Sequence, residues 1–347
     1  MTGESALPTQ LLAPLLAPIQ AMSLADAPVV VAAGRMQLAD LLRQLDDGLL
    51  MSSLTSTFND VLTRRLVVLT AVTHRLPSVP WCWLAFGSEG RGEQTWLTDQ
   101  DNGLVFQAAD ELEANALRQL FLPFAEAVNA HLAAAGMAYC PGRIMAGNPA
   151  CCLSSDEWRW RFLEWVRRPD PGALLNAAIF FDLRVLHGDP APLMAWHGEV
   201  LAAARNTPAL LHLLAGNAVQ AEPPLSFRGE CVPDKQGLLD LKKFGTRIFV
   251  DAARIFALSE GRAEAGTVSR LQSVGSLVGL SQGEVAAALA AFAQLQRLRI
   301  HHQLSGAGQS NALAWSSLHD MDKSILREAL VQAKRVQQRL KLNYFVQ

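Results

Sequence analysis

Charged residues are scarce in this 347-residue sequence, and the two signs nearly cancel. Lysine, arginine, aspartate and glutamate together make up 18% of the residues, and the formal net charge at pH 7 is -2. The sequence therefore lacks the basic excess that binding to nucleic acid or to an anionic membrane surface requires, so no nucleic-acid partner and no membrane are expected. Half of the residues are hydrophobic, which is enough for a chain of this length to bury a large core.

Paired cysteines and a targeting signal are also absent from the sequence. The five cysteines are odd in number and show no Cys-x-x-Cys spacing, which predicts a reducing, cytoplasmic setting and gives no sign of a zinc site. The uncharged stretch 5–25 is broken by Pro8, Pro14 and Pro18, and no basic residue precedes it. It therefore predicts neither a signal peptide nor a membrane span.

One stretch, residues 84–106, carries the clearest functional pattern. An apolar run at residues 81–86 predicts a buried strand, and the chain becomes apolar again at residues 104–106. Between these runs lies a polar loop that begins with Gly87-Ser88 and ends with Asp99-Gln100-Asp101. Side chains two residues apart on an extended backbone project from the same face, so the two aspartates have the geometry to bind a divalent metal ion. Backbone amides freed at the Gly-Ser break are the groups that bind phosphate oxygens, so the pattern predicts nucleoside triphosphate chemistry.

The flanking residues predict a sheet assembled from strands that are separated by helices. Apolar residues at helical spacing predict helices at 36–49 and 54–72 and a long amphipathic helix at 110–135, which Gly136 ends. Residues 137–145 fit a further strand, interrupted by Pro141-Gly142. Before about residue 34 the prolines predict a loosely packed lead with one or two short helices.

Helical patterns dominate the sequence after residue 154. Helices are expected at 173–186, 191–217, 237–260, 267–276, 281–303 and 317–343, with the segment 221–235, rich in proline and glycine, as the best internal boundary. The predicted fold class is α+β, a small mixed β-sheet domain with flanking helices followed by an all-helical C-terminal domain. The expected limits are 1–53 for an N-terminal helical lead, 54–190 for the sheet domain and 191–347 for the helical domain.

The spacing of Gly87-Ser88 and Asp99-Gln100-Asp101 resembles the signature motif of the polymerase-beta-type nucleotidyltransferase superfamily. Gly90-Arg91-Gly92-Glu93 is similar to the uridylyltransferase that modifies the PII nitrogen-regulatory protein. The whole string from Gly87 to Asn102 is closest to a family of bacterial nucleotidyltransferases, often fused to cyclic-nucleotide-binding and CBS domains. Segments 139–149, 180–184, 188–189, 239–242, 253–254 and 298–303 also resemble that family. We expect no room for those regulatory modules in this chain, so that any regulation by them is either absent or supplied in trans.

The resemblance implies a signal-transduction enzyme that moves a nucleoside monophosphate from a nucleoside triphosphate to an acceptor hydroxyl, with a protein as one candidate acceptor. It implies that Asp99 and Asp101 hold Mg²⁺, with Mn²⁺ as the second choice. The predicted nucleotide-binding residues are Gly87, Ser88, Gly90, Arg91, Lys242 and Arg254. For Lys242 and Arg254, a solvated helix face with ion pairs is the competing interpretation. Glu93 joins the aspartates as a catalytic candidate, either by steering Arg91 or a metal-bound water or simply as a carboxylate near a helix start.

The sequence lacks one carboxylate that the resemblance leads us to expect. Active members of the superfamily commonly carry a third carboxylate on a later strand, yet no Asp or Glu lies between Glu126 and Asp156. The predicted strand at 137–145 therefore cannot provide it, and Glu93 and Asp182 are the candidates to replace it in space. Two other hypotheses stay open at this point, a nucleotide-binding regulatory module with weakened or no catalysis and a scaffold that keeps only the fold.

Overall fold

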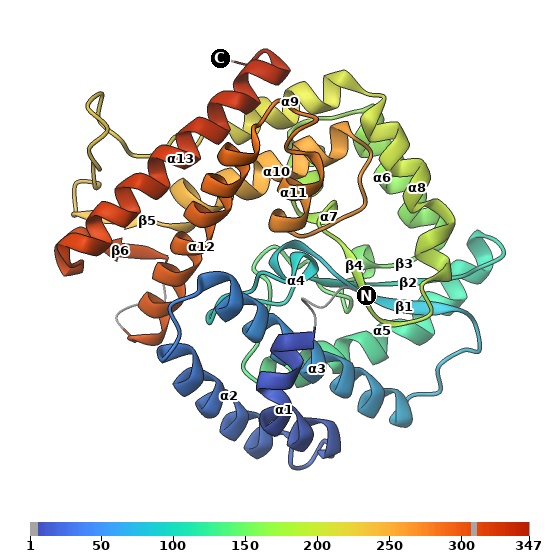
Figure 1. Cartoon of the computed structure of the whole chain (residues 1–347). Coiled ribbons are helices and arrows are strands. Elements are labelled where there is room, and N and C mark those ends of the chain that lie inside the picture. The colour runs from blue at the N-terminus through green and yellow to red at the C-terminus, as the bar shows by residue number, and fades with distance from the viewer. Residues whose placement is uncertain (1–5, 307–310, 347) are drawn as a thin grey trace. The chain divides into compact units, whose positions relative to one another are not determined.

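The computed structural model describes residues 6–306 and 311–346 (Figure 1). The chain divides into two compact units that alternate along the sequence. The first, here called the sheet domain, comprises residues 1–44, 52–164 and 179–200, and the second, the helical domain, comprises 45–51, 165–178 and 201–347. The limits 1–53, 54–190 and 191–347 expected from the sequence stay predictions.

A mixed sheet of four strands forms the centre of the sheet domain. Its strands are β1 (Trp81–Ala85), β2 (Asn102–Phe106), β3 (Cys152–Ser154) and β4 (Arg184–Gly188), in the spatial order β3-β2-β1-β4. Strand β1 runs antiparallel to both β2 and β4, whereas β2 and β3 are parallel. The small mixed sheet and its two central strands are therefore confirmed.

Helices surround this sheet and make most of the domain. They are α1 (Ala6–Ala21), α2 (Ala27–Arg43), α3 (Gly48–Thr73), α4 (Gly87–Arg91), α5 (Glu111–Ala134), α6 (Ser155–Arg167) and α8 (Ala191–Arg205). The predicted helices at 36–49 and 54–72 correspond to α2 and α3, whose break lies at residues 44–47. The predicted amphipathic helix at 110–135 is α5, which Gly136 ends in the left-handed conformation at φ +87°.

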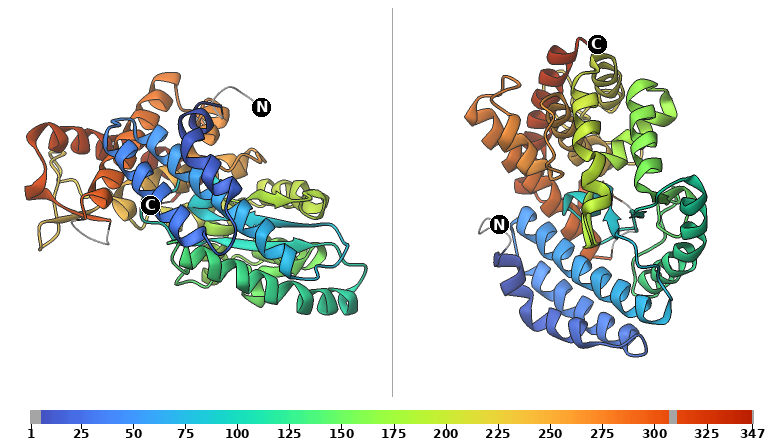
Figure 2. Two further views of the ribbon diagram at one scale, coloured as in Figure 1. Left: turned by 90° about the horizontal axis from the view of Figure 1, so that it is seen from below. Right: turned by 90° about the vertical axis from the view of Figure 1, so that its right-hand side faces the viewer.

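Both faces of β1 are covered by aromatic side chains, because successive residues of a strand point to opposite sides. Trp81 and Trp83 face α5, with ring centroids 5.5 and 6.4 Å from Phe124. Phe86, one residue after the strand, lies on the other side, 5.7 Å from the ring of Trp158 on α6. Figure 2 shows α5 running along the sheet. This packing fixes the end of β1, where the functional loop begins.

The N-terminal lead is longer and better packed than its prolines predict. Helix α1 continues through Pro14 and Pro18, and Leu12 and Ile19 are fully buried. These two apolar side chains lie two turns apart on one face, so their burial offsets the backbone hydrogen bonds lost at the prolines. The prediction of a loosely packed lead is wrong.

Two predictions about the edges of the sheet are also wrong. Residues 137–145 form no strand and make only an isolated parallel bridge between Asp99 and Ala138, while the third strand, β3, follows at residues 152–154. The predicted helix at 173–186 ends at Phe180, after which the chain enters β4. A short apolar run is compatible with either a buried helix or a buried strand, and here it contains both.

The helical domain contains most of α7 (Pro171–Phe180) and then α9 (Pro208–Ala218), α10 (Arg247–Ser259), α11 (Thr267–Val274), α12 (Gln282–Leu304) and α13 (Asp320–Tyr344). The predicted helix 191–217 is two helices, α8 and α9. The predicted helix at 237–260 instead begins with a strand and a π-helical turn, Lys242–Thr246, and only then continues as α10. Besides the helices, β5 (Leu238–Asp240) and β6 (Ala312–Ala314) form a two-stranded antiparallel ribbon. Nearly all of α10 is buried, so it is the central helix of this domain.

In the part of the chain that the structure describes, no helix is both long and apolar enough to cross a membrane.

All five cysteines are free thiols, and four of them, Cys82, Cys140, Cys151 and Cys152, are buried. Burial raises the pKa of Cys82 and Cys152 to about 12, so these thiols are packing groups with little nucleophilic character.

Candidate metal and phosphate site

Two aspartates and a cysteine meet beside the start of β2. One carboxylate oxygen from Asp99, one from Asp101 and the Sγ atom of Cys140 all lie within 4.8 Å of one another. Among the described residues, this is the one group of three or more His, Cys, Asp or Glu side chains close enough to hold a metal ion. Carboxylate oxygens are ligands of Mg²⁺ and Mn²⁺, so the donors present fit the cation that the sequence predicts.

The residues that alternate with the two aspartates face the protein interior. Gln100 and Asn102 are fully buried, and both side chains accept a hydrogen bond from Nδ2 of Asn129 on α5, at 2.8 and 2.9 Å. Gln100 also donates from Nε2 to the backbone oxygens of Asn129 and Met137, at 3.1 and 2.9 Å. These bonds anchor the backbone between the aspartates, so the two carboxylates are held on the opposite face.

The segment that carries Cys140 is attached to this strand entry through its own backbone. The oxygens of Ala138 and Ile144 accept hydrogen bonds from the amides of Gln100 and Asn102, at 2.9 and 3.1 Å. Oδ1 of Asn102 accepts a further bond from the amide of Ala146 at 2.9 Å. Cys140 therefore has a fixed place beside the aspartates although its segment is not a strand. Burial, together with the negative charge of Asp101, raises the pKa of Cys140 to about 12, and the protonated thiol is hydrogen-bonded to the Asp101 side chain.

The Gly-Ser turn lies directly against the second aspartate. Gly87 has φ +55°, and a Cβ atom built on it would be 2.9 Å from Oδ2 of Asp101. The amide of Phe86 donates to the backbone oxygen of Asp101 at 2.8 Å, which holds the two segments together. Glycine at position 87 thus leaves room beside the carboxylate and adopts a backbone conformation that other residues rarely take. The predicted phosphate turn, Gly87 with Ser88, and the predicted metal pair are neighbours.

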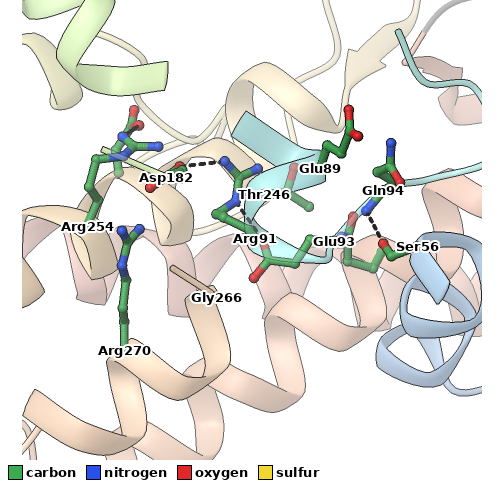
Figure 3. Close-up of polar contacts among 12 residues, drawn as sticks. Ser56, Glu89, Arg91, Glu93, Gln94, Asp182, Thr246, Arg254, Gly266 and Arg270 are labelled. Atoms are coloured by element: carbon green, nitrogen blue, oxygen red, sulfur yellow. Dashed lines mark hydrogen bonds and ion pairs between the residues drawn. The ribbon is translucent and has the colours of Figure 1, made fainter. Parts of the chain in front are cut away.

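Arg91, at the end of α4, lies between two carboxylates (Figure 3). Its Nε donates to Oε2 of Glu93 at 2.8 Å and its Nη1 donates to Oδ2 of Asp182 at 2.6 Å. The three side chains are 12%, 9% and 0% exposed, so these are buried ion pairs. Of the two roles considered for Glu93, steering Arg91 is the one for which the structure supplies a contact. Neither Glu93 nor Asp182 belongs to the cluster of Asp99, Asp101 and Cys140.

Gly90 has a packing role in addition to any contact with nucleotide. A Cβ atom at this position would lie 1.9 Å from the backbone oxygen of Asp182 and 2.8 Å from that of Ala85. Only a residue without a side chain allows α4 to approach the chain this closely. Helix α4 then ends at Gly92, which is left-handed at φ +67°.

Helix α3 fixes the loop between α4 and the aspartates. Oγ of Ser56 accepts a hydrogen bond from the amide of Gln94 at 2.9 Å, also drawn in Figure 3, and Nδ2 of Asn59 donates to Oε1 of Gln94 at 3.2 Å. Nε2 of Gln94 in turn donates to Oγ1 of Thr98 at 3.3 Å, just before Asp99. Gln94 and Thr98 therefore help to orient the loop before the aspartates.

Two family models match the chain. "Putative nucleotidyltransferase DUF294" matches residues 35–172, which include the whole metal and phosphate site, and "Putative nucleotidyltransferase substrate binding domain" matches residues 208–344. Together they account for most of the chain. The chain belongs to this nucleotidyltransferase family. No curated protein matches it. The family membership supports an enzyme of the nucleotidyltransferase type whose substrate is a nucleoside triphosphate.

In the region matched by the substrate-binding model, Lys242 and Arg254 lie on neighbouring elements. Lys242 begins the π-helical turn, and its backbone amide donates to Oδ1 of Asp240 at 2.9 Å. Arg254 lies on α10 and is buried, and its Nη1 donates to Oδ1 of Asp251 at 2.7 Å. The ion pair on α10 is the one that the helical spacing suggested, but Arg254 is not on a solvated face. Contact of either residue with nucleotide or acceptor stays a prediction.

Glu89 is a member of the site that the sequence reasoning missed. It lies on α4 with 1% of its surface exposed, and its Oε2 accepts a hydrogen bond from the amide of Asp101 at 3.4 Å. Burial raises its pKa to about 8, the negative charges of Asp60 and Asp101 act in the same direction, and Arg184 opposes them. Arg184 donates two bonds of 2.7 and 2.6 Å to the Asp60 carboxylate and two more, of 3.2 and 3.0 Å, to the backbone oxygen of Glu89 rather than to its carboxyl group. Glu89 is therefore a neutral carboxyl group beside Asp101 at neutral pH.

The stability of the protein should depend on pH through Glu89. Its pKa is raised in the folded state to about 8 from an ordinary 4.5, so between these values the folded chain keeps a proton that the unfolded chain releases. The free energy of unfolding should thus fall as pH rises through this window, by at most about 1.4 kcal/mol per pH unit. In Glu89→Gln, which keeps the shape and cannot titrate, urea unfolding should show a shallower decline. Equal slopes for the two proteins would contradict this assignment.

Three residues of the site, Cys140, Glu89 and Asn129, were not among the site residues predicted from the sequence. Cys140 and Asn129 reach the motif only because α5 and the segment after it fold back onto the start of β2. Glu89 stands inside the motif, and a carboxylate four residues after the end of β1 was the available signal. Its burial depends on α3 and β4, which the motif itself does not reveal.

Proposed function

We propose that the chain transfers a nucleoside monophosphate from a nucleoside triphosphate to an acceptor hydroxyl, with Mg²⁺ held by Asp99 and Asp101. The observation that carries this proposal is that the Gly-Ser turn lies against the metal pair. A Cβ atom built on Gly87 would be 2.9 Å from Oδ2 of Asp101. A turn that binds phosphate, next to a carboxylate pair that binds a cation, suits a ligand that is a metal-bound polyphosphate. When bound, Mg²⁺ would neutralise phosphate charge and help orient the α-phosphate for in-line attack.

The residues of this chain would bind and orient the substrate. The backbone at Gly87 and the hydroxyl of Ser88 would bind the β- and γ-phosphates. Arg91 would add positive charge near the phosphates, while Glu93 and Asp182 hold its guanidinium in a fixed orientation. Lys242 and Arg254 would contact the nucleotide or the acceptor, and their place within the model named for substrate binding supports this assignment.

The acceptor we propose is a hydroxyl on a regulatory protein, as in the uridylyltransferase that the Gly-Arg-Gly-Glu segment resembles. A second candidate function is nucleotide binding with weakened or no catalysis. One observation favours it, because the third group beside the two aspartates is the thiol of Cys140 and not the carboxylate that the resemblance leads us to expect. The two candidates make opposite predictions about turnover.

A labelling experiment separates these candidates. The full chain would be incubated with each α-³²P-labelled nucleoside triphosphate and Mg²⁺ in cell lysate, beside a variant with Asp99→Asn and Asp101→Asn, and analysed by gel and by pyrophosphate release. A labelled band that requires the wild-type aspartates would support transfer and would identify the base and the acceptor. Nucleotide binding without label or pyrophosphate, in lysates from several growth conditions that vary acceptor and activator, would favour the binding module.

A further inference from the structure

The thiol of Cys140 stands in a chemically unusual place for a buried cysteine. Its Sγ lies within 4.8 Å of carboxylate oxygens from both Asp99 and Asp101, and the side chain is 7% exposed. Buried cysteines that only pack are usually surrounded by apolar groups, as small hydrophobic residues are. Here the thiol instead lies beside two carboxylates and is hydrogen-bonded to one of them, Asp101. A bound cation would be attracted by both carboxylates and could replace the thiol proton.

The position of Cys140 is fixed by the backbone around it and by its own thiol. The backbone oxygens of Ala138 and Ile144, on either side of it, accept bonds from the amides of Gln100 and Asn102, next to the aspartates at the start of β2. The thiol is hydrogen-bonded to the Asp101 side chain and to the backbone of Gly142 and Ile144. Cys140 is therefore held where its Sγ can reach a cation bound by the two aspartates.

Two oxygens and one sulfur differ in chemistry from three oxygens. Mg²⁺ takes oxygen ligands almost exclusively, whereas Zn²⁺ and Co²⁺ accept a mixture of carboxylate, imidazole and thiolate ligands. Three protein ligands with an open fourth position are also the usual arrangement of a zinc site that binds substrate or water. The thiol must lose its proton to become a ligand, and metal binding commonly drives such a loss.

We propose that Cys140 is a third metal ligand beside Asp99 and Asp101, which gives this site a high affinity for thiophilic divalent cations such as Zn²⁺ and Co²⁺. The inference rests on the metal pair of the proposed function and deepens it. Mg²⁺ binds through the two carboxylates and the phosphates of the nucleotide, whereas a thiophilic cation binds through all three side chains. The two kinds of cation compete for one site, and Zn²⁺ therefore inhibits Mg²⁺-dependent nucleotide binding.

Cobalt reports the thiolate directly, because a Co²⁺–thiolate bond gives a charge-transfer absorption band in the near ultraviolet that carboxylate ligands do not give. The metal-free full chain would be titrated with Co²⁺ as wild type, Cys140→Ser, Asp99→Asn with Asp101→Asn, and Cys231→Ser. Cys231 is the matched control, since it is a free thiol in the helical domain. We expect the band in wild type and in Cys231→Ser, saturating at about one Co²⁺ per chain, and its loss in Cys140→Ser and in the double aspartate variant.

Zinc affinity gives a second readout that does not depend on catalysis. Competition of Zn²⁺ against a chromophoric chelator should show affinity lower by at least about 10- to 100-fold in Cys140→Ser, the loss that even an outer partner of a metal ligand causes. Mg²⁺-dependent nucleotide binding by the same variant should change far less. Circular dichroism of each variant would show whether it is folded.

The outcomes distinguish this inference from the proposed function. Cobalt that binds folded wild-type protein by calorimetry without the thiolate band would overturn the role of Cys140 and leave the aspartate pair intact, and so would a band that survives in Cys140→Ser. No cobalt binding at all would overturn it as well. If the band appears as expected but wild type shows no Mg²⁺-dependent nucleotide binding, the thiolate site stands and the proposed function fails.

Discussion

Asparagine at both position 99 and position 101 is expected to abolish the effect of Mg²⁺ on nucleotide binding. Asparagine keeps the size of the side chain and removes its charge, so the variant can form the same fold but cannot provide two anionic ligands for the cation. Wild type should bind its nucleoside triphosphate at least about 10-fold more tightly with Mg²⁺ than without it, because the metal links the carboxylates to the phosphates. Isothermal titration calorimetry with each of the four nucleoside triphosphates, with Mg²⁺ and with chelator, measures this ratio.

Asp110→Asn is the matched control for that experiment. Asp110 is the N-cap of α5 and accepts a hydrogen bond from the amide of Glu113 at 2.8 Å. It lies in the same domain but outside the cluster, and asparagine caps a helix about as well as aspartate does. This control should keep the wild-type ratio. A double variant that still responds to Mg²⁺ as wild type does would show that the metal is held elsewhere.

Gly90→Ala should be among the most destabilising single substitutions in the sheet domain. The added methyl group would stand 1.9 Å from the backbone oxygen of Asp182, and backbone on both sides cannot move away as the end of a flexible side chain can. Overpacking of this kind costs about 3 kcal/mol or more in the free energy of unfolding. Because Asp182 also accepts a bond from Arg91, the displacement should weaken nucleotide binding as well. Thermal and urea unfolding of purified protein measure the first effect.

Gly92→Ala separates crowding from backbone strain in the same turn. Gly92 has φ +67°, and no atom beyond its chain neighbours lies within 4 Å of the position that a Cβ would take. Alanine there should lower the free energy of unfolding by only about 1 kcal/mol, the cost of the left-handed backbone conformation. The Gly90 variant should therefore be clearly less stable than the Gly92 variant. Equal loss of stability in the two would mean that the close approach of α4 to Asp182 is unimportant.

The parts of the fold that could be predicted are those whose signal is local and long. Helix α5 has an apolar stripe over more than six turns and a glycine stop, and β1 is a continuous apolar run bounded by a glycine. Strand β3 has three residues, Cys152–Ser154, which is too short for any periodic pattern. Strand β4 follows α7 after three residues, in a largely apolar stretch with the charged residues Asp182 and Arg184, and residue type alone does not show where the helix ends.

The residues of the candidate site that could be predicted are likewise those with a local sequence signal. Asp99, Asp101 and Gly87 could be identified because they stand in one short string whose spacing reflects the geometry of a strand and a turn. The predicted strand at 137–145 failed for a physical reason: its backbone bonds to the start of β2, at Ala138 and Ile144, are too far apart to form a ladder, and the Met137 oxygen accepts its bond from the Gln100 side chain. Hydrogen bonds between distant side chains and backbone leave no periodic trace, so the position of Cys140 could not be derived from the sequence.

The way in which the segment around Cys140 is held has a consequence for the proposed choice of ion. Its neighbours are fastened by backbone groups, at Ala138, Ile144 and Ala146, and the side chain at position 140 contributes none of these three bonds. Under the proposed role of Cys140, the scaffold and the preference for an ion would therefore be separate traits. A single substitution at position 140 would then change which ion is preferred while these three bonds remain.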